Sequence, residues 1–131
     1  MPSIFTRIVK GEIPAHKVYE DAQNIAFLDI TPIQPGHVLV VPKREVAYLF
    51  DLSSDEQAAL WRVVRTVEAG VKKATACARV CLMVVGWEVP HVHVHLVPTN
   101  RALDFPVPPK ITRTPGQLAA MASAIQRAVS A

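Results

Sequence analysis

Three histidines alternate with aliphatic residues between Pro90 and Pro98, in the sequence PHVHVHLVP. Alternation with β-branched residues is typical of a strand that is buried on one face, because successive side chains of a strand point to opposite faces. The pattern predicts that His91, His93 and His95 form a row on one face, with neighbours roughly 7 Å apart along the strand. The aliphatic residues between them then face the core. This row is the main candidate for chemistry in the chain.

Length and composition fit one globular domain. The chain has 131 residues, of which 50% are hydrophobic and 19% charged, and a chain of this size can bury a sizeable core. Its longest apolar run, residues 80–85, is too short to cross a bilayer, and residues 1–7 lack the apolar stretch of a signal peptide. We therefore expect no membrane partner and a cytoplasmic location. Cys77 and Cys81 form no Cys-x-x-Cys motif and are expected to be small buried residues.

The charge of the chain is mildly positive. The net charge is +3 and the pI is about 9.1, with lysines and arginines scattered along the sequence. A nucleic-acid binder usually carries a basic stripe, so no nucleic-acid partner is expected. The charge suits a small anionic ligand such as a phosphate.

Local patterns predict an α+β domain. Strands are expected at 17–20, 25–30, 37–41 and 80–85, a short helix after Ser3, and a long helix from Ser53 that is opened by a capping box. Helices and antiparallel strands in separate runs favour the α+β class. We expect one domain over residues 1–131. Residues 100–131 form an extension, with a proline-containing arm and a closing amphipathic helix from Thr114.

Three interpretations of the histidine row remain open. A neutral imidazole is a good nucleophile toward phosphorus, so the row can serve phosphoryl or nucleotidyl transfer. Alternatively, a His-x-His pair with a third histidine, or with His37 or His16 from elsewhere, can bind zinc. The third interpretation is a solvent-facing polar strand face without function. Three histidines in register favour a functional site.

Several other residues have an ordinary structural interpretation beside a functional one. Asp29 follows a strand, where an acid is usually a turn residue, and Trp87 is either a core residue or a pocket wall. His37 begins a strand after Pro-Gly, as surface residues often do. The apolar residues Phe5, Ile8, Phe27 and Ile30 fit a hydrophobic core.

The chain resembles the histidine triad family. The motif at 91–97 has the family's alternation of histidine and apolar residues, and segments 3–14, 18–21, 26–30 and 35–43 are similar to the family's other blocks in the same order. The resemblance covers roughly residues 3–98. No motif matches beyond Asn100.

The resemblance implies a histidine-triad fold and a nucleotide substrate. The fold has an antiparallel sheet of about five strands with one long helix and one or two shorter ones, usually in a homodimer. Family members hydrolyse or transfer purine nucleoside phosphate conjugates, namely phosphoramidates, adenylates or dinucleotide polyphosphates. No cofactor and no metal are implied. Thr6 stands where some relatives carry a zinc-binding cysteine.

The resemblance also implies roles for individual residues. His93 is the nucleophile that forms a nucleotidyl-histidine, and His91, His95 and His37 surround it as further catalytic residues. Asp29 falls at the position that binds the ribose hydroxyls. The residues expected to enclose the purine base are Phe5, Ile8, Ile13, Phe27 and Ile30.

The segment before the triad departs from the family pattern. Relatives usually carry an asparagine and a glycine-rich polar loop there, whereas this chain runs from Val85 directly into Gly86-Trp87-Glu88. Trp87 and Glu88 therefore occupy positions that normally contact the phosphate and the leaving group. An indole and a carboxylate supply fewer donors, and the carboxylate brings negative charge near an anion. This departure keeps a second hypothesis open, a nucleotide-binding module with little catalysis.

Overall fold

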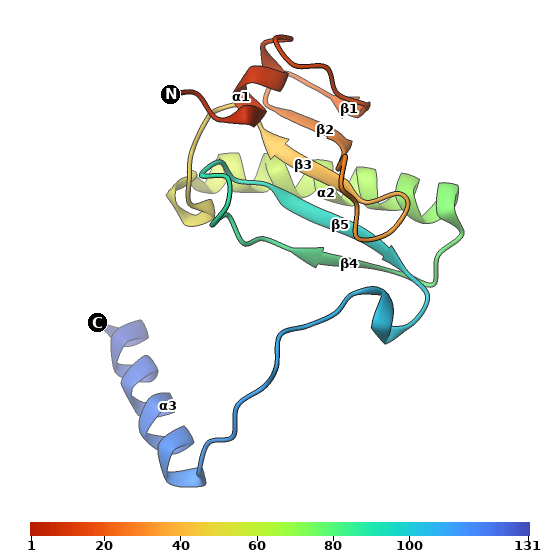
Figure 1. The fold of residues 1–131 in the computed structure, drawn as a ribbon. Helices are drawn as coiled ribbons and strands as arrows, with labels where there is room; N and C mark the ends of the chain where they lie inside the picture. Colours follow the sequence, from red (N-terminus) through yellow and green to blue (C-terminus); the bar gives the residue numbers. More distant parts are fainter.

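The computed structural model describes all of residues 1–131, and its central element is a five-stranded antiparallel sheet (Figure 1). The strand order is β1-β2-β3-β5-β4. The strands are β1 (Lys17–Glu20), β2 (Asn24–Leu28), β3 (Val38–Pro42), β4 (Arg79–Met83) and β5 (Val94–Thr99). The α-helices are α1 (Ile4–Val9), α2 (Ser54–Thr75) and α3 (Pro115–Ser130), and two short 3-10 turns lie at Leu49–Asp51 and Ala102–Asp104. The predicted α+β class with five strands is confirmed.

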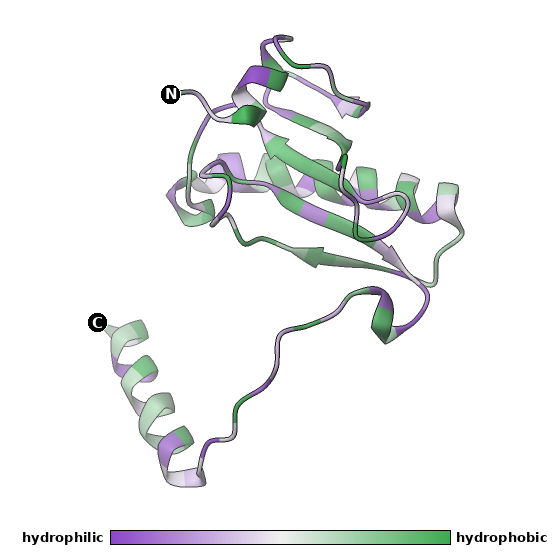
Figure 2. Ribbon diagram, viewed as in Figure 1, coloured by the Kyte–Doolittle hydropathy of each residue, from purple (hydrophilic) through white to green (hydrophobic).

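Helix α2 builds the core on one face of the sheet. It begins with the predicted capping box, in which Ser53 and Glu56 each accept a hydrogen bond from the other's backbone amide. The central strands are largely hydrophobic, as Figure 2 shows, and the apolar stripe of α2 covers them. The buried residues of this layer are Ala26, Val38, Val40, Leu52, Leu60, Val63, Val64, Val67, Val71, Val92, Val94 and Leu96.

Helix α1 covers part of the opposite face. The Ser3 hydroxyl caps it by accepting from the Thr6 amide, as predicted. Phe5 and Ile8 project from α1 onto the sheet and join a second buried cluster with Ile25, Phe27, Leu39 and Val41. The buried layer under α2 is thus aliphatic, whereas the cluster on the other face combines two phenylalanines with aliphatic residues.

Strand β5 is shorter than predicted. It begins at Val94, because the amides of His91 and Val92 bind the carbonyls of Val89 and Val46 outside the sheet ladder. The alternation of faces nevertheless extends through the irregular residues before the strand. Val92, Val94 and Leu96 all lie in the layer under α2, so the histidines between them belong to the other face.

Strand β2 also ends earlier than predicted. It stops at Leu28, and Asp29 turns the chain by accepting hydrogen bonds from the amide and hydroxyl of Thr31. Ile30 is 82% exposed and is not the buried strand residue that its apolar neighbours suggested.

The C-terminal extension leaves the domain. Helix α3 forms over the predicted residues, with a capping box at Thr114, at the end of an arm that points away from the sheet (Figure 1). All residues from Pro106 to the C-terminus are exposed, including the apolar side chains of α3. The helix therefore does not close onto the domain of its own chain.

The cysteines and the hydropathy of the helices were also the subject of predictions. Cys77 is buried and Cys81 half-buried, and both are free thiols. None of the helices is long and apolar enough to cross a membrane.

Candidate functional site

Four histidines gather on the sheet face that carries α1. His95 on β5 is paired with Leu39 on β3, and its ring centroid lies 4.8 Å from that of His93 and 5.2 Å from that of His37. His91 and His93 are 0% and 7% exposed. The interpretation as a solvent-facing polar strand face is therefore wrong.

A backbone hydrogen bond fixes the tautomer of His93. Its Nδ1 lies 2.7 Å from the carbonyl oxygen of His91, and a carbonyl oxygen can only accept. Nδ1 of His93 therefore carries the proton, and Nε2 of the neutral ring keeps its lone pair. Phe5 packs on this ring at 4.8 Å with an interplanar angle of 70°. The neutral ring therefore presents Nε2 as its acceptor nitrogen.

His91 is held at both ring nitrogens. Its Nε2 lies 2.7 Å from the carbonyl oxygen of Pro42 and must donate to it. Its Nδ1 is then an acceptor and lies 2.6 Å from the hydroxyl of Ser3. Both ring positions are satisfied, so His91 itself offers no free nitrogen to a ligand.

His37 and His95 form a second hydrogen-bonded chain. The amide of Ile33 donates to Nδ1 of His37, so the neutral His37 ring carries its proton on Nε2. This nitrogen lies 3.0 Å from Nδ1 of His95 and donates to it. Consequently His95 keeps its own proton on Nε2. The site therefore offers one acceptor nitrogen on His93 and one donor nitrogen on His95.

Burial favours the neutral form of His37, His91 and His95. Desolvation lowers the pKa of His37 and of His91 below 6.5. Desolvation, followed by the nearby His93 and His37, lowers the pKa of His95 to about 4. The three rings are thus uncharged at neutral pH, as the tautomers assigned above require.

Asp29 lies beside the second chain. Its Oδ1 accepts from Thr31, while Oδ2 is 3.7 Å from Nε2 of His37, which is too long for a hydrogen bond. The oxygen Oδ2 therefore remains available as an acceptor. Asp29, His37 and His95 also bring three metal-ligand atoms within 4.8 Å of one another. The proton shared between the two rings accounts for their contact without an ion.

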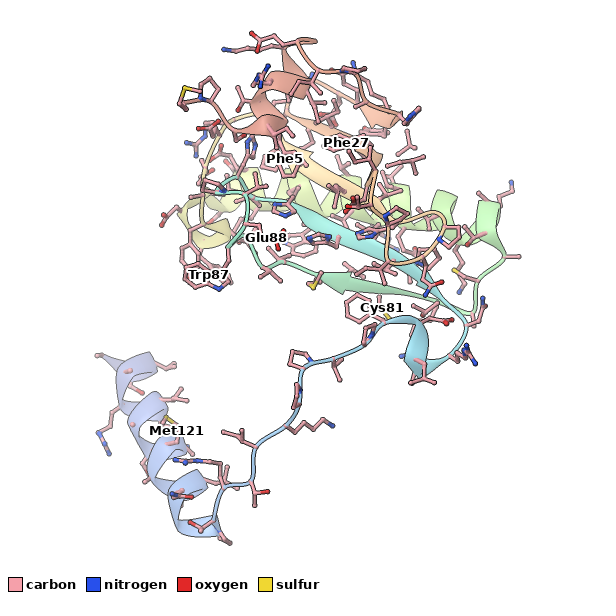
Figure 3. The ribbon with its side chains drawn as sticks, viewed as in Figure 1. Phe5, Phe27, Cys81, Trp87, Glu88 and Met121 are labelled. Atoms are coloured by element: carbon pink, nitrogen blue, oxygen red, sulfur yellow. The ribbon has the colours of Figure 1, made fainter.

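An apolar pocket lies next to the histidines. It has a volume of about 120 Å³ and holds all five apolar residues predicted at the base position, together with Asp29. The rings of Phe5 on α1 and Phe27 on β2 pack against each other with centroids 5.7 Å apart, and both are labelled in Figure 3. The lining residues are Ile4, Phe5, Ile8, Ile13, Pro14, Ala15, Phe27, Leu28, Asp29, Ile30 and Leu39.

A second cavity is lined by His93. It has a volume of about 270 Å³ and is bounded by Gly86 and Val92 as well as by residues 47–50. Neither Trp87 nor Glu88 lines it. Trp87 is 91% exposed and points away from the sheet (Figure 3), so it is not a core residue. Glu88 is exposed on the same loop.

Another apolar cavity lies between α2 and strands β1 to β3. It has a volume of about 340 Å³, and none of the histidines lines it. Its only ionisable lining group is the Tyr19 phenol.

Three residues that contact the site carry no functional signal in the sequence. The sequence pattern indicates only a helix cap for Ser3 and a missing thiol for Thr6, and it indicates nothing for Glu45. Glu45 accepts from the Ser3 amide and the Thr6 hydroxyl, directly beside His91. Contacts between residues this far apart in sequence leave no local pattern.

Sequence comparisons point to one family. The HIT domain model matches residues 10–102. An uncharacterised HIT-like protein of Methanocaldococcus jannaschii is 41% identical over 99 residues, which cover 72% of this chain and 77% of that protein. An adenosine 5'-monophosphoramidase of Schizosaccharomyces pombe is 36% identical over 75% of this chain and 74% of its own length. A bis(5'-nucleosyl)-tetraphosphatase of the same yeast is 36% identical over 73% of this chain and 55% of its own.

Solved structures give the same result. A HIT family protein of Bacillus subtilis superimposes with a TM-score of 0.85 and 26% identity, covering 97% of this chain and 96% of that one. A histidine triad nucleotide-binding protein of Candida albicans superimposes with a TM-score of 0.81 and 28% identity, covering 98% of both chains. Such coverage includes the C-terminal arm and α3.

Proposed function

This chain belongs to the HIT domain family, and we propose that it is a hydrolase or transferase of purine nucleoside phosphate conjugates. The substrates are phosphoramidates, adenylates or dinucleotide polyphosphates. The observation that carries the proposal is the orientation of His93, whose Nδ1 proton is engaged by the His91 carbonyl. A nucleophile needs a ring nitrogen with a free lone pair, and in the neutral His93 ring that nitrogen is Nε2.

The reaction proceeds in two displacements at the α-phosphorus. In the first, the lone pair of His93 Nε2 forms a nitrogen–phosphorus bond while the bond to the leaving group breaks, and the leaving group takes up a proton from solvent. In the second, a water oxygen bonds to phosphorus, the nitrogen–phosphorus bond breaks, and its electron pair returns to Nε2. The water releases its proton to solvent. The products are a nucleoside monophosphate and the free leaving group.

The neighbouring histidines assist without changing charge. The Nε2 proton of His95 is a donor for a phosphoryl oxygen on which negative charge develops. The donor geometry of His95 is held by His37, at 3.0 Å. His91 acts through its backbone carbonyl, which accepts a hydrogen bond from His93, and its ring does not face the substrate.

The apolar pocket supports a nucleoside substrate. Aromatic and aliphatic walls suit the faces of a purine base, and Phe5 also contacts His93. The free Oδ2 of Asp29 at the pocket edge can accept a hydrogen bond from a ribose hydroxyl. Similarity to the yeast phosphoramidase and tetraphosphatase agrees with a nucleotide substrate.

The loop between β4 and β5 favours a second candidate, a nucleotide-binding module with little catalysis. Its Trp87 and Glu88 side chains are exposed, and a carboxylate is a poor neighbour for an anionic substrate. Trapping with a radiolabelled AMP phosphoramidate separates the two. An acid-labile adduct on His93 after rapid quenching supports the enzyme. Tight AMP binding without an adduct supports the module and overturns the proposal.

We also propose a homodimer. The apolar side of α3 touches nothing in its own chain, and its sole charge, Arg127, makes it a weak candidate for an anionic membrane surface. The edge strand β4 and the residues after it expose Leu82, Val84 and Val85. A second copy of this chain offers both surfaces at once, and mutual burial explains why neither is covered within one copy.

A further inference from the structure

Three distant parts of the chain meet at the His91 ring. Ser3 and Thr6 come from the N-terminus and first turn of α1, Glu45 from the loop after β3, and His91 from the segment before β5. The Ser3 hydroxyl lies 2.6 Å from His91 Nδ1, and the Thr6 hydroxyl lies 3.5 Å from the same atom. Glu45 Oε1 lies 2.6 Å from the Ser3 amide nitrogen and 2.7 Å from the Thr6 hydroxyl.

The direction of each proton in this cluster can be assigned. A carboxylate only accepts, so both the Ser3 amide and the Thr6 hydroxyl donate to Glu45. His91 Nδ1 is an acceptor, because its Nε2 proton is donated to the carbonyl of Pro42. The Ser3 hydroxyl therefore donates to His91, while its oxygen accepts from the Thr6 amide at 3.1 Å.

Glu45 is exposed, and its hydrogen bonds favour the carboxylate form. The hydrogen bonds from the Ser3 amide and the Thr6 hydroxyl, with the largest contribution from the amide, lower its pKa from 4.5 to about 2. Charge-assisted hydrogen bonds of this kind are stronger than neutral ones. The carboxylate thus fastens the beginning of α1 to the loop that follows β3.

We propose that Ser3, Thr6 and Glu45 are positioning residues that act through His91 to hold His93 as the Nδ1-protonated tautomer. The His91 ring is clamped between Ser3 and Pro42, at 2.6 and 2.7 Å. Its backbone carbonyl is consequently fixed at the place where His93 Nδ1 donates, 2.7 Å away. The consequence for catalysis rests on the proposed function of His93 as nucleophile.

Helix capping alone does not explain the arrangement. A cap requires only that the Ser3 oxygen accept from the Thr6 amide. The Ser3 hydroxyl also donates its proton to His91, which the cap does not require. The Thr6 hydroxyl and Glu45 have no part in the cap. The same helix carries Phe5, whose ring contacts both His91 and His93 at 5.7 and 4.8 Å. The cluster therefore places the aromatic wall and the imidazoles together.

Four substitutions separate positioning from simple structural support. Glu45→Ala and Thr6→Val remove hydrogen bonds of the cluster. Glu45→Gln keeps an acceptor oxygen at Oε1, whereas Ser3→Thr keeps both the donor and the cap. Glu12→Ala is the matched control, because Glu12 is an exposed acid whose ion pair with Arg7, at 3.5 Å, lies outside the cluster.

The first measurement is the tautomer of His93 by nitrogen NMR of the imidazoles in the unliganded protein. Wild type is expected to show one tautomer, protonated at Nδ1. Glu45→Ala and Thr6→Val are expected to show a mixture with the Nε2 form, while Glu45→Gln, Ser3→Thr and Glu12→Ala match wild type. The tautomer is insensitive to mere loss of stability, and thermal unfolding confirms that each variant is folded.

The second measurement is turnover of AMP phosphoramidate. Loss of the hydrogen bonds to Glu45 is expected to lower kcat about tenfold with little change in KM, and Glu45→Gln, which keeps an acceptor oxygen, is expected to retain most of the wild-type kcat. An unchanged His93 tautomer in Glu45→Ala and Thr6→Val overturns the inference, whatever the activity. If wild type forms no product and no adduct, the proposed function fails, while the tautomer measurement still decides the positioning role.

Discussion

The Nδ1 atom of His93 lies 2.7 Å from the backbone carbonyl oxygen of His91, two residues earlier in the chain. One histidine thereby sets the protonation pattern of the other through its main chain, and the ring of His91 is left free to bind Ser3 and Pro42. The motif is therefore not a row of three equivalent imidazoles. Its members have separate tasks that follow from their hydrogen-bond partners.

Replacing His93 with asparagine is expected to abolish turnover. No other imidazole presents an unprotonated nitrogen to the cavity, so kcat for AMP phosphoramidate should fall about a thousandfold or more. Circular dichroism and urea unfolding check that the variant is folded. Activity near that of wild type would show that another group attacks phosphorus.

Ile30→Ala is expected to weaken nucleotide binding without destabilising the protein. The side chain is 82% exposed yet lines the apolar pocket, so its removal should raise KM about tenfold and change the free energy of unfolding by less than about 0.5 kcal/mol. Ile111→Ala is the matched control, since Ile111 is 83% exposed on the arm. Equal KM values in the two variants would exclude Ile30 from the base site.

Stability is expected to fall in mildly acidic solution. The folded protein holds the pKa of His95 at about 4, below the 6.5 of an exposed histidine. Between these values the unfolded chain binds more protons, so the free energy of unfolding decreases as the pH falls from about 6.5 toward 4. Urea unfolding across this range measures the slope. His95→Asn should flatten it, and identical slopes for both proteins would contradict the assignment.

Glu88→Gln is expected to raise kcat/KM for an anionic substrate. The carboxylate is exposed on the loop before the triad, where solvent screens its repulsion, so the gain should be at most about fivefold and should shrink with added salt. Glu68→Gln, on the helix across the sheet, removes the same charge and should have no effect. A decrease in kcat/KM would instead indicate that Glu88 assists the reaction.

Truncation after Phe105 is expected to weaken self-association without unfolding the domain. Residues from Pro106 onward are exposed and leave the aliphatic core intact, so the unfolding midpoint at low protein concentration should be unchanged. Sedimentation of the full chain and the truncated chain measures the association. Identical dimer affinities would place the contact on β4 alone.

Much of the fold could be predicted from local pattern. The capping box at Ser53 predicted the start of α2, and alternation assigned Val92, Val94 and Leu96 to the core. Family resemblance added the number of strands. The ends of strands were less predictable, because Asp29 bonds Thr31 and Val92 bonds Val46, and such contacts outweigh the β-propensity of the neighbouring residues.

The candidate site was predictable where it lies on regular elements. The five apolar residues and Asp29, placed by resemblance, do line one pocket. The cluster around Glu45 could not be anticipated, because its partners are separated by 42 and 39 residues. The exposure of Trp87 was not predicted, since its expected places were the core or a pocket wall and its side chain is 91% exposed.

β5 and the residues before it present aliphatic side chains to α2 and histidines to the opposite face. One segment of the chain therefore supplies both the hydrophobic core and the histidine site. Inserting or deleting one residue between His91 and Leu96 would turn imidazoles into the aliphatic layer and valines toward the nucleotide. The connection at 84–90 carries no such constraint, since its side chains are mostly exposed. Natural variation in length is therefore expected to collect in that connection and to be absent from the motif that follows it.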